Sequence, residues 1–161
     1  MKTIAGRCVL GCVALFLLME VNMNSARAEE VPFPKLPAGA GEIAKDAPKE
    51  FTKTASGLRY RILRPGTGQK PAATDKVKVN YHGWLESGKV FDSSYKRQQP
   101  ISFPLNRVIK GWTEGMQLVG EGGMIELEIP SDLGYGDDGT PDGTIPGKAK
   151  LHFLVELLKI E

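Results

Sequence analysis

The feature that most constrains the fold is a period-two alternation of apolar and polar side chains in four separated segments. Successive side chains of a strand point to opposite faces, so this pattern predicts β-strands with one buried face. The apolar members of the four segments are Leu58, Tyr60, Ile62, Val77, Val79, Tyr81, Ile125, Leu127, Ile129, Leu151, Phe153, Val155 and Leu157.

Glycine and proline punctuate these segments, with 19 and 11 copies respectively in 161 residues. Pro65-Gly66-Thr67-Gly68 ends the first strand, and Glu86-Ser87-Gly88-Lys89 predicts a hairpin turn before Val90. The last segment, residues 149–160, also fits a helical stripe. The preceding Pro146-Gly147 and the earlier strands favour a strand there.

One stretch, about Val108 to Leu118, predicts a helix, because Ile109, Trp112 and Met116 recur at near-helical spacing. Two glycines inside it weaken helix formation, so the helix should be short. The predicted fold class is therefore α+β, with an antiparallel sheet and one short helix lying against it.

Residues 1–28 are expected to be a cleavable signal peptide. Two basic residues precede the apolar run Val9–Met19, and Ala26-Arg27-Ala28 gives a small-x-small pattern before Glu29. The run is shorter than the roughly 20 residues of a membrane span, so a retained anchor is the weaker alternative. A lipoprotein signal at Cys12 is weaker still, because the apolar run mostly follows that cysteine. The mature chain is therefore expected to be exported, either periplasmic or secreted, without stable membrane insertion.

Removing this leader changes the balance of charge and the cysteine count. Three basic and one acidic residue leave the totals of 21 and 19, so 18 of each remain and the net charge is zero. A neutral chain gives no indication of nucleic-acid binding. Cys8 and Cys12 also leave, which excludes a disulfide, a thiol nucleophile or a thiolate metal site in the mature chain.

Residues 29–50 are rich in proline and glycine and show no apolar period, so we expect a semi-extended linker. It is too short for a dimerisation domain, which makes a monomer the expectation. The globular part is then residues 51–161.

Several kinds of chemistry lack their usual motifs. The chain has no Gly-x-Ser-x-Gly and no Gly-rich phosphate loop ending in Gly-Lys-Ser/Thr. His82 and His152 lie seventy residues apart, and Asp137, Asp138 and Asp142 do not match the spacing of a calcium loop. We therefore expect no metal and no cofactor.

What remains is a set of aromatic residues spread over nearly every expected element. Aromatic side chains on strands most simply form core. Trp112 differs, because a short glycine-flanked helix presents it where a sheet must cover it or form a hollow. Tyr135 lies in a long loop, where a core aromatic is less expected. The set is Tyr81, Trp84, Phe91, Phe103, Trp112, Tyr135 and Phe153.

In order and spacing, five motifs between Gly57 and Glu161 resemble the FKBP-type peptidyl-prolyl cis-trans isomerases, in an exported, single-domain, bacterial-like form. They are Val79-Asn80-Tyr81-His82-Gly83, Phe91-Asp92-Ser93-Ser94, Val108-Ile109-Lys110-Gly111-Trp112, Leu133-Gly134-Tyr135-Gly136 and Ile145-Pro146, followed by the run Leu151 to Glu161. The resemblance implies a curved antiparallel sheet wrapped around one short helix.

It also implies a pocket with Trp112 as its floor and Asp92 and Tyr135 as polar groups at its rim. Tyr81 and Ile109 join these two as catalytic candidates. The remaining substrate-binding candidates are Phe91, Ile101, Phe103, Val108, Ile145 and Phe153. Ile101 stands where relatives often carry an aromatic residue, and Thr140-Pro141-Asp142 stands where a histidine is often found.

The activity implied is rotation about X-Pro bonds during folding of exported polypeptides, with macrolide inhibitors as further ligands. Such a pocket favours the twisted amide by desolvation and needs no cofactor. One alternative is a non-catalytic chaperone or scaffold that binds peptides in the same groove. Another is a hydrolase that pairs Asp92 with Glu126 or Glu128, although these glutamates are expected to face solvent.

Overall fold

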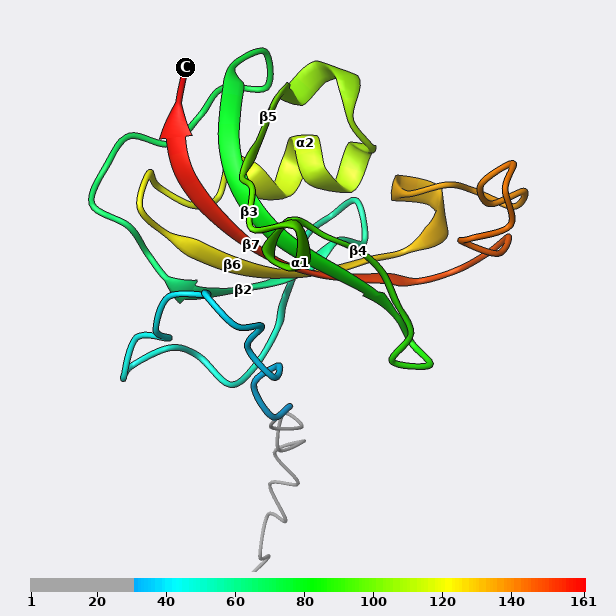
Figure 1. The fold of residues 1–161 in the computed structure, drawn as a ribbon, viewed down its shortest axis with the longest axis horizontal. Helices are drawn as coiled ribbons and strands as arrows, with labels where there is room; N and C mark the ends of the chain where they lie inside the picture. Colours follow the sequence, from blue (N-terminus) through cyan, green and yellow to red (C-terminus); the bar gives the residue numbers. More distant parts are fainter. Residues whose placement is uncertain (1–30) are drawn as a thin grey trace, which may run out of the picture.

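A single antiparallel sheet carries the fold in the computed structural model, which describes residues 31–161 (Figure 1). The expected leader and its cleavage position lie outside these residues. The strands run in the order β1-β2-β6-β7-β3-β4, and β5 also pairs with β3. They are β1 (Thr52–Lys53), β2 (Arg59–Arg64), β3 (Lys76–Leu85), β4 (Val90–Ser93), β5 (Ile101–Pro104), β6 (Met124–Ile129) and β7 (Leu151–Ile160).

Helices are few and short. They are α1 (Ser94–Arg97), η1 (Leu105–Arg107), α2 (Lys110–Met116) and η2 (Ser131–Leu133). Among residues 31–161, none of these helices has the length and apolar character needed to cross a membrane.

The two longest strands, β3 and β7, pair along almost their whole length, with Tyr81 opposite Val155 and Gly83 opposite Phe153. The last segment is thus a strand, as its flanking turn residues predicted, and not a helix. The curved sheet wraps around α2, which confirms the predicted fold class (Figure 1).

Helix α2 approaches the sheet closely because two of its residues are glycines. A Cβ atom on Gly111 would lie 2.5 Å from Ile129 Cγ2, and one on Gly115 would lie 2.7 Å from Leu127 Cδ2. Contacts this short do not occur in packed proteins, so a larger residue at either position would force Ile129 or Leu127 to move within the core. The glycines that weaken the helix therefore bring it against β6.

The helix is shorter than the predicted range of about 108–118. Val108 and Ile109 have extended backbone angles, with φ −118° and −59° and ψ 176° and 147°. The Ile109 carbonyl accepts the first helical hydrogen bonds, from Trp112 N–H at 2.9 Å and Thr113 N–H at 3.2 Å. The helix can therefore begin only at Lys110.

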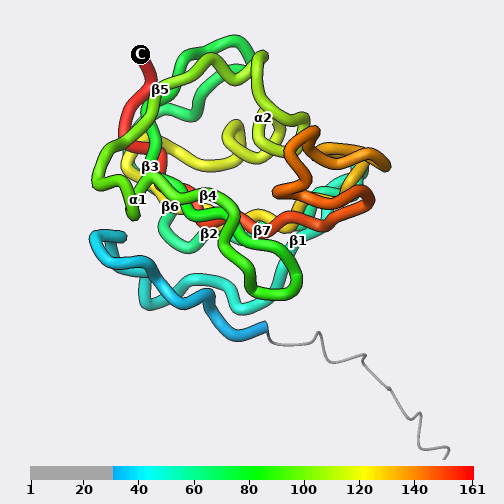
Figure 2. The backbone as a smooth tube through the Cα atoms, turned by 45° about the vertical axis from the view of Figure 1, so that its right-hand side comes forward, coloured from blue at the N-terminus to red at the C-terminus, as the bar shows by residue number. Residues whose placement is uncertain are grey.

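Residues 31–50 form no strand or helix, as a linker would, but they pack along the face of the sheet opposite α2 (Figure 2). We call this segment the strap. Arg61 donates to the carbonyls of Val31, Pro32 and Lys49 at 2.6 to 2.8 Å. Leu36 and Ile43 pack on a small apolar cluster of Leu63, Met124 and Leu154. The sequence indicated no such docking.

The strap also explains why the expectation for Glu126 and Glu128 was wrong. Both are buried, at 4% and 8% exposure, although they alternate with core residues. Glu126 accepts from Arg61 Nε at 2.6 Å, and Glu128 accepts from Arg59 at 2.5 Å. Burial raises the pKa of Glu126 despite its bond to Arg61. Strand β6 is therefore covered on both faces.

The contact between α2 and β6 gives a first prediction. Gly111→Ala should lower the free energy of unfolding by about 1–2 kcal/mol, because overpacking costs about 1–3 kcal/mol and the gain in helix propensity returns about 1 kcal/mol at most. Urea denaturation measures this. Lys110→Ala, at an exposed position of the same helix, is the control and should stay within about 0.5 kcal/mol of the parent. An unchanged or higher stability of Gly111→Ala would contradict the packing argument.

The buried pair gives a second prediction. Arg61→Met should destabilise the fold by about 3–5 kcal/mol at pH 7, because it leaves the Glu126 charge buried without a partner. The double variant Arg61→Met/Glu126→Met should recover part of this loss. A pKa raised in the folded state means that the folded protein binds the proton more tightly. The destabilisation of Arg61→Met relative to the double variant should therefore be largest above the folded pKa and shrink as pH falls. A pH-independent difference in urea midpoints would argue against an unpaired buried carboxylate.

Candidate active site

A pocket of about 720 Å³ opens between the concave face of the sheet, η1, the start of α2 and the loop before β7. Every residue predicted for the site lines it. Four further lining residues were not predicted: Arg107, Thr140, Asp142 and Thr144. The complete lining is Tyr81, Phe91, Asp92, Ile101, Phe103, Arg107, Val108, Ile109, Trp112, Tyr135, Thr140, Asp142, Thr144, Ile145 and Phe153.

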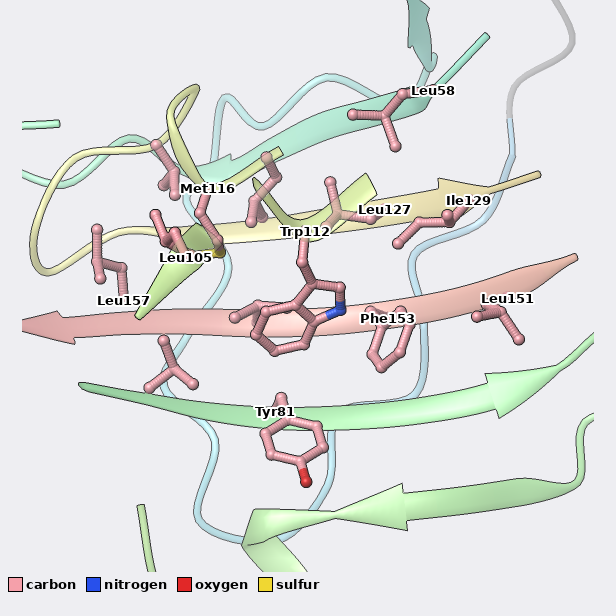
Figure 3. Close-up of a cluster of buried hydrophobic side chains, with 14 of the residues drawn as sticks. Leu58, Tyr81, Leu105, Trp112, Met116, Leu127, Ile129, Leu151, Phe153 and Leu157 are labelled. Atoms are coloured by element: carbon pink, nitrogen blue, oxygen red, sulfur yellow. The ribbon is translucent and has the colours of Figure 1, made fainter. Parts of the chain in front are cut away.

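Trp112 lines this pocket and is held by three rings in edge contact. Figure 3 shows the indole with two of them, Tyr81 and Phe153. The centroids of Tyr81, Phe103 and Phe153 lie 5.5, 5.2 and 5.2 Å from the indole. Trp112 retains 5% exposure. Edge-to-face contacts of this kind are favourable for aromatic rings and fix the indole on several sides.

A further glycine makes room for the wall of the pocket. A Cβ on Gly83 would lie 2.7 Å from both Phe91 and Phe153, whose rings contact each other edge-on at 5.4 Å. Gly83 therefore lets β4 and β7 bring their phenylalanines together across β3.

The polar rim is a hydrogen-bonded network of three side chains, those of Asp92, Tyr81 and Arg97. Tyr81 and Arg97 both donate to the Asp92 carboxylate, and Arg97 also donates to the Tyr81 hydroxyl at 2.9 Å. The backbone N–H of Ser93 adds a bond to Asp92 at 2.7 Å. Sequence reasoning missed Arg97, which lies at the end of α1. The signal for it was local, because Ser93 caps this one-turn helix and so places Arg97 beside Asp92.

These contacts fix the protonation states at neutral pH. Partial burial opposes ionisation of Asp92, but the bonds from Tyr81 and Arg97 hold its pKa below the ordinary value. Burial raises the pKa of Tyr81, as does its bond to Asp92, and burial and the charge of Asp92 raise the pKa of Tyr135. Asp92 is therefore a carboxylate whose oxygens are occupied, and both phenols keep their protons.

The donors of the pocket that have no partner include one phenol hydroxyl and one backbone N–H. Neither the Tyr135 hydroxyl nor the Ile109 N–H has a partner within residues 31–161. Tyr135 is 42% exposed, yet its loop is anchored by bonds from Gly136 N–H to Ser131 and from Lys148 N–H to Gly136, both 2.9 Å. An anchored loop and a helix start thus offer two donors to one hollow.

The hydrolase alternative is wrong in its choice of carboxylates. Glu126 and Glu128 lie under the strap on the opposite face of the sheet and do not line the pocket. Asp142 does line it, but hydrogen bonds from Thr140 and Thr144 lower its pKa to about 2. In residues 31–161 no three His, Cys, Asp or Glu side chains gather in a way that could hold a metal ion. His82 and His152 instead flank Trp84, with ring centroids 5.7 and 5.6 Å away.

Comparison with known proteins agrees with this geometry. The family described as FKBP-type peptidyl-prolyl cis-trans isomerase matches residues 67–158. The FKBP-type isomerase FkpA of Aeromonas hydrophila is 47% identical over 141 residues, which cover 87% of this chain and 52% of that protein.

Solved structures match the fold as well. The crystal structure of FkpA from Escherichia coli has a TM-score of 0.67 at 45% identity, over 69% of this chain and 51% of that one. An isomerase structure from Pseudomonas syringae has a TM-score of 0.64 at 40% identity, over 69% of this chain and 80% of that one.

The chain spans about half the length of the curated relatives it matches, at 52%, 58% and 46% for three of them. The family match nevertheless covers more than half of this chain and includes β3 to β6 and most of β7. The chain therefore belongs to the FKBP-type peptidyl-prolyl cis-trans isomerase family.

Proposed function

We propose that this chain is a peptidyl-prolyl cis-trans isomerase that accelerates rotation about X-Pro bonds in polypeptides. The observation that carries the proposal is the ring-lined hollow above Trp112, bordered by two unused hydrogen-bond donors. An extended peptide has carbonyls on both sides of a proline. Two fixed donors can hold these carbonyls while the bond between them turns.

The reaction breaks no covalent bond, so the site has to stabilise only a twisted amide. The uncatalysed barrier is about 18–20 kcal/mol, because the planar amide is stabilised by resonance. Twisting reduces the dipole of the amide, and water therefore solvates the planar state better than the twisted one. An apolar pocket that excludes water removes this advantage of the planar state. A rate enhancement of about 10⁴ requires about 5.5 kcal/mol of such differential stabilisation.

In this proposal each polar group of the rim has a separate role. Tyr135 hydroxyl and Ile109 N–H bind substrate carbonyls. Asp92, itself held by Arg97, orients the Tyr81 ring against the reacting amide. Asp92 is not a general base here, because rotation transfers no proton.

The setting of the activity is also a proposal. The leader pattern in residues 1–28 supports folding of exported proteins, in a periplasm or outside the cell. Residues 29–50 show no pattern of a dimerisation segment, which supports a monomer. Light scattering of the mature chain tests this.

The aromatic pocket is suited to a macrolide inhibitor. Competition between the inhibitor and a proline peptide for binding tests this. A chaperone without catalysis would bind the same peptide and leave its isomerisation rate unchanged.

Removal of single rim groups should separate their roles. Tyr135→Phe should lower kcat/KM about 2- to 10-fold, the value of one neutral hydrogen bond, and Asp92→Asn about 10- to 100-fold, because a charged acceptor is lost. A protease-coupled assay on a proline peptide measures both. Tyr60→Phe, at a tyrosine outside the pocket, is the matched control and should retain the parent rate. Unchanged rates in both rim variants would overturn the assigned roles.

The pH dependence should be flat. Asp92, with its pKa below the ordinary 3.8, stays ionised, and both tyrosines, with raised pKa values, stay protonated. We expect kcat/KM to be constant from about pH 5 to 9. Arg97→Gln should raise the pKa of Asp92, seen by ¹³C NMR titration of its carboxyl carbon. A depressed pKa contributes stability that is fully present above the unfolded pKa and is lost as pH falls through the folded pKa, so this variant should be less stable than the parent near neutral pH and the difference should shrink in acid. A bell-shaped profile centred near neutrality would contradict these assignments.

A further inference from the structure

We propose that Arg107 makes this isomerase selective for substrates that carry a carboxylate on one side of the X-Pro bond. The inference rests on the proposed function, because it names the substrate class for the same pocket. It starts from a cation that the described structure leaves without a partner.

Arg107 is the last residue of η1, is exposed and lines the pocket. Within residues 31–161 its guanidinium forms no ion pair and no hydrogen bond. A guanidinium has five N–H donors in a planar fork that matches a carboxylate. Arg107 therefore presents this fork at the edge of the pocket, and its N–H donors have no acceptor there.

The other charged groups in the lining are already engaged. Asp92 accepts from Tyr81, Arg97 and the Ser93 N–H. Asp142 accepts from the Thr144 N–H at 3.0 Å and the Thr144 hydroxyl at 2.7 Å. Among residues 31–161, Arg107 is therefore the one charged residue of the lining that has no bonding partner of its own and can take one from a ligand.

The position of Arg107 specifies which part of a substrate it meets. It precedes Ile109 by two residues, and the Ile109 N–H is the proposed donor to a substrate carbonyl. The two Cα atoms of adjacent substrate residues lie 3.8 Å apart, so the side chain beside that carbonyl falls within reach of the long arginine side chain. Tyr135 and Asp142 lie on the loop before β7, which is a different part of the lining from η1 and the start of α2. A carboxylate is thus favoured near Ile109 and disfavoured near Asp142.

Exposed ion pairs are weak, so the effect is modest and electrostatic. We expect kcat/KM for a glutamate peptide to exceed that of the matching glutamine peptide about 1.5- to 5-fold at low ionic strength. The preference should shrink as salt rises, because the screening length is about 10 Å at 0.1 M and about 3 Å at 1 M.

The experiment uses the full chain and two pairs of proline peptides. In one pair Glu replaces Gln directly after the proline, and in the other it replaces Gln two residues before the proline. The parent should prefer Glu in one of these two positions only. Arg107→Gln should abolish that preference, and Arg107→Lys should retain a preference of the same sign. Lys110→Gln, an exposed cation nearby that does not line the pocket, should leave the Glu/Gln ratio unchanged.

Equal Glu/Gln ratios in both pairs, or a ratio lowered as much by Lys110→Gln as by Arg107→Gln, would overturn the selectivity. If no peptide is isomerised at all, the proposed function fails by itself. Binding of the same four peptides, followed by NMR shifts of the pocket residues, then decides the role of Arg107. Tighter binding of one Glu peptide that Arg107→Gln removes supports the inference, and equal binding contradicts it.

Discussion

The close approach of α2 to β6 is the constraint on which the rest of the structure depends. Gly111 and Gly115 let the helix lie directly on Ile129 and Leu127, and this depth places the Trp112 indole among the rings of the sheet. A helix held farther out would leave the indole above the sheet instead of at the base of a hollow. Gly83 acts in the same way on the opposite wall. These three glycines thus shape the cavity, because none of them carries a Cβ atom.

Period-two alternation predicted β2, β3, β6 and β7, and with the short helix these gave the fold class. It did not predict β1 or β5, which are only two and four residues long. The pocket residues were implied by the resemblance to the FKBP-type isomerases, and all of them lie in the lining of the pocket. The pattern was misleading for β6. Its glutamates alternate as solvent-facing residues do, but Arg59 and Arg61 neutralise them from a strand more than sixty residues away. A pairing over such a separation leaves no local signal.

The strap escaped prediction for a related reason. It is held through its backbone carbonyls and a few apolar side chains, not through a repeating face. Backbone groups are the same in every sequence, so composition indicated only a linker. Arg97 and Arg107 were missed differently. Both lie at the ends of single-turn helices. A charged side chain there is expected to face solvent unless the position of the turn is known.

The bonds of Arg61 to the strap have a geometric consequence for how this protein can be attached to something else. They fasten Val31 and Pro32 to the face of the sheet opposite α2 (Figures 1 and 2). The pocket, in contrast, is lined by the start of α2. A surface, bead or fusion partner joined at residue 31 would therefore stand behind the pocket, and the pocket would stay open toward the surrounding solution.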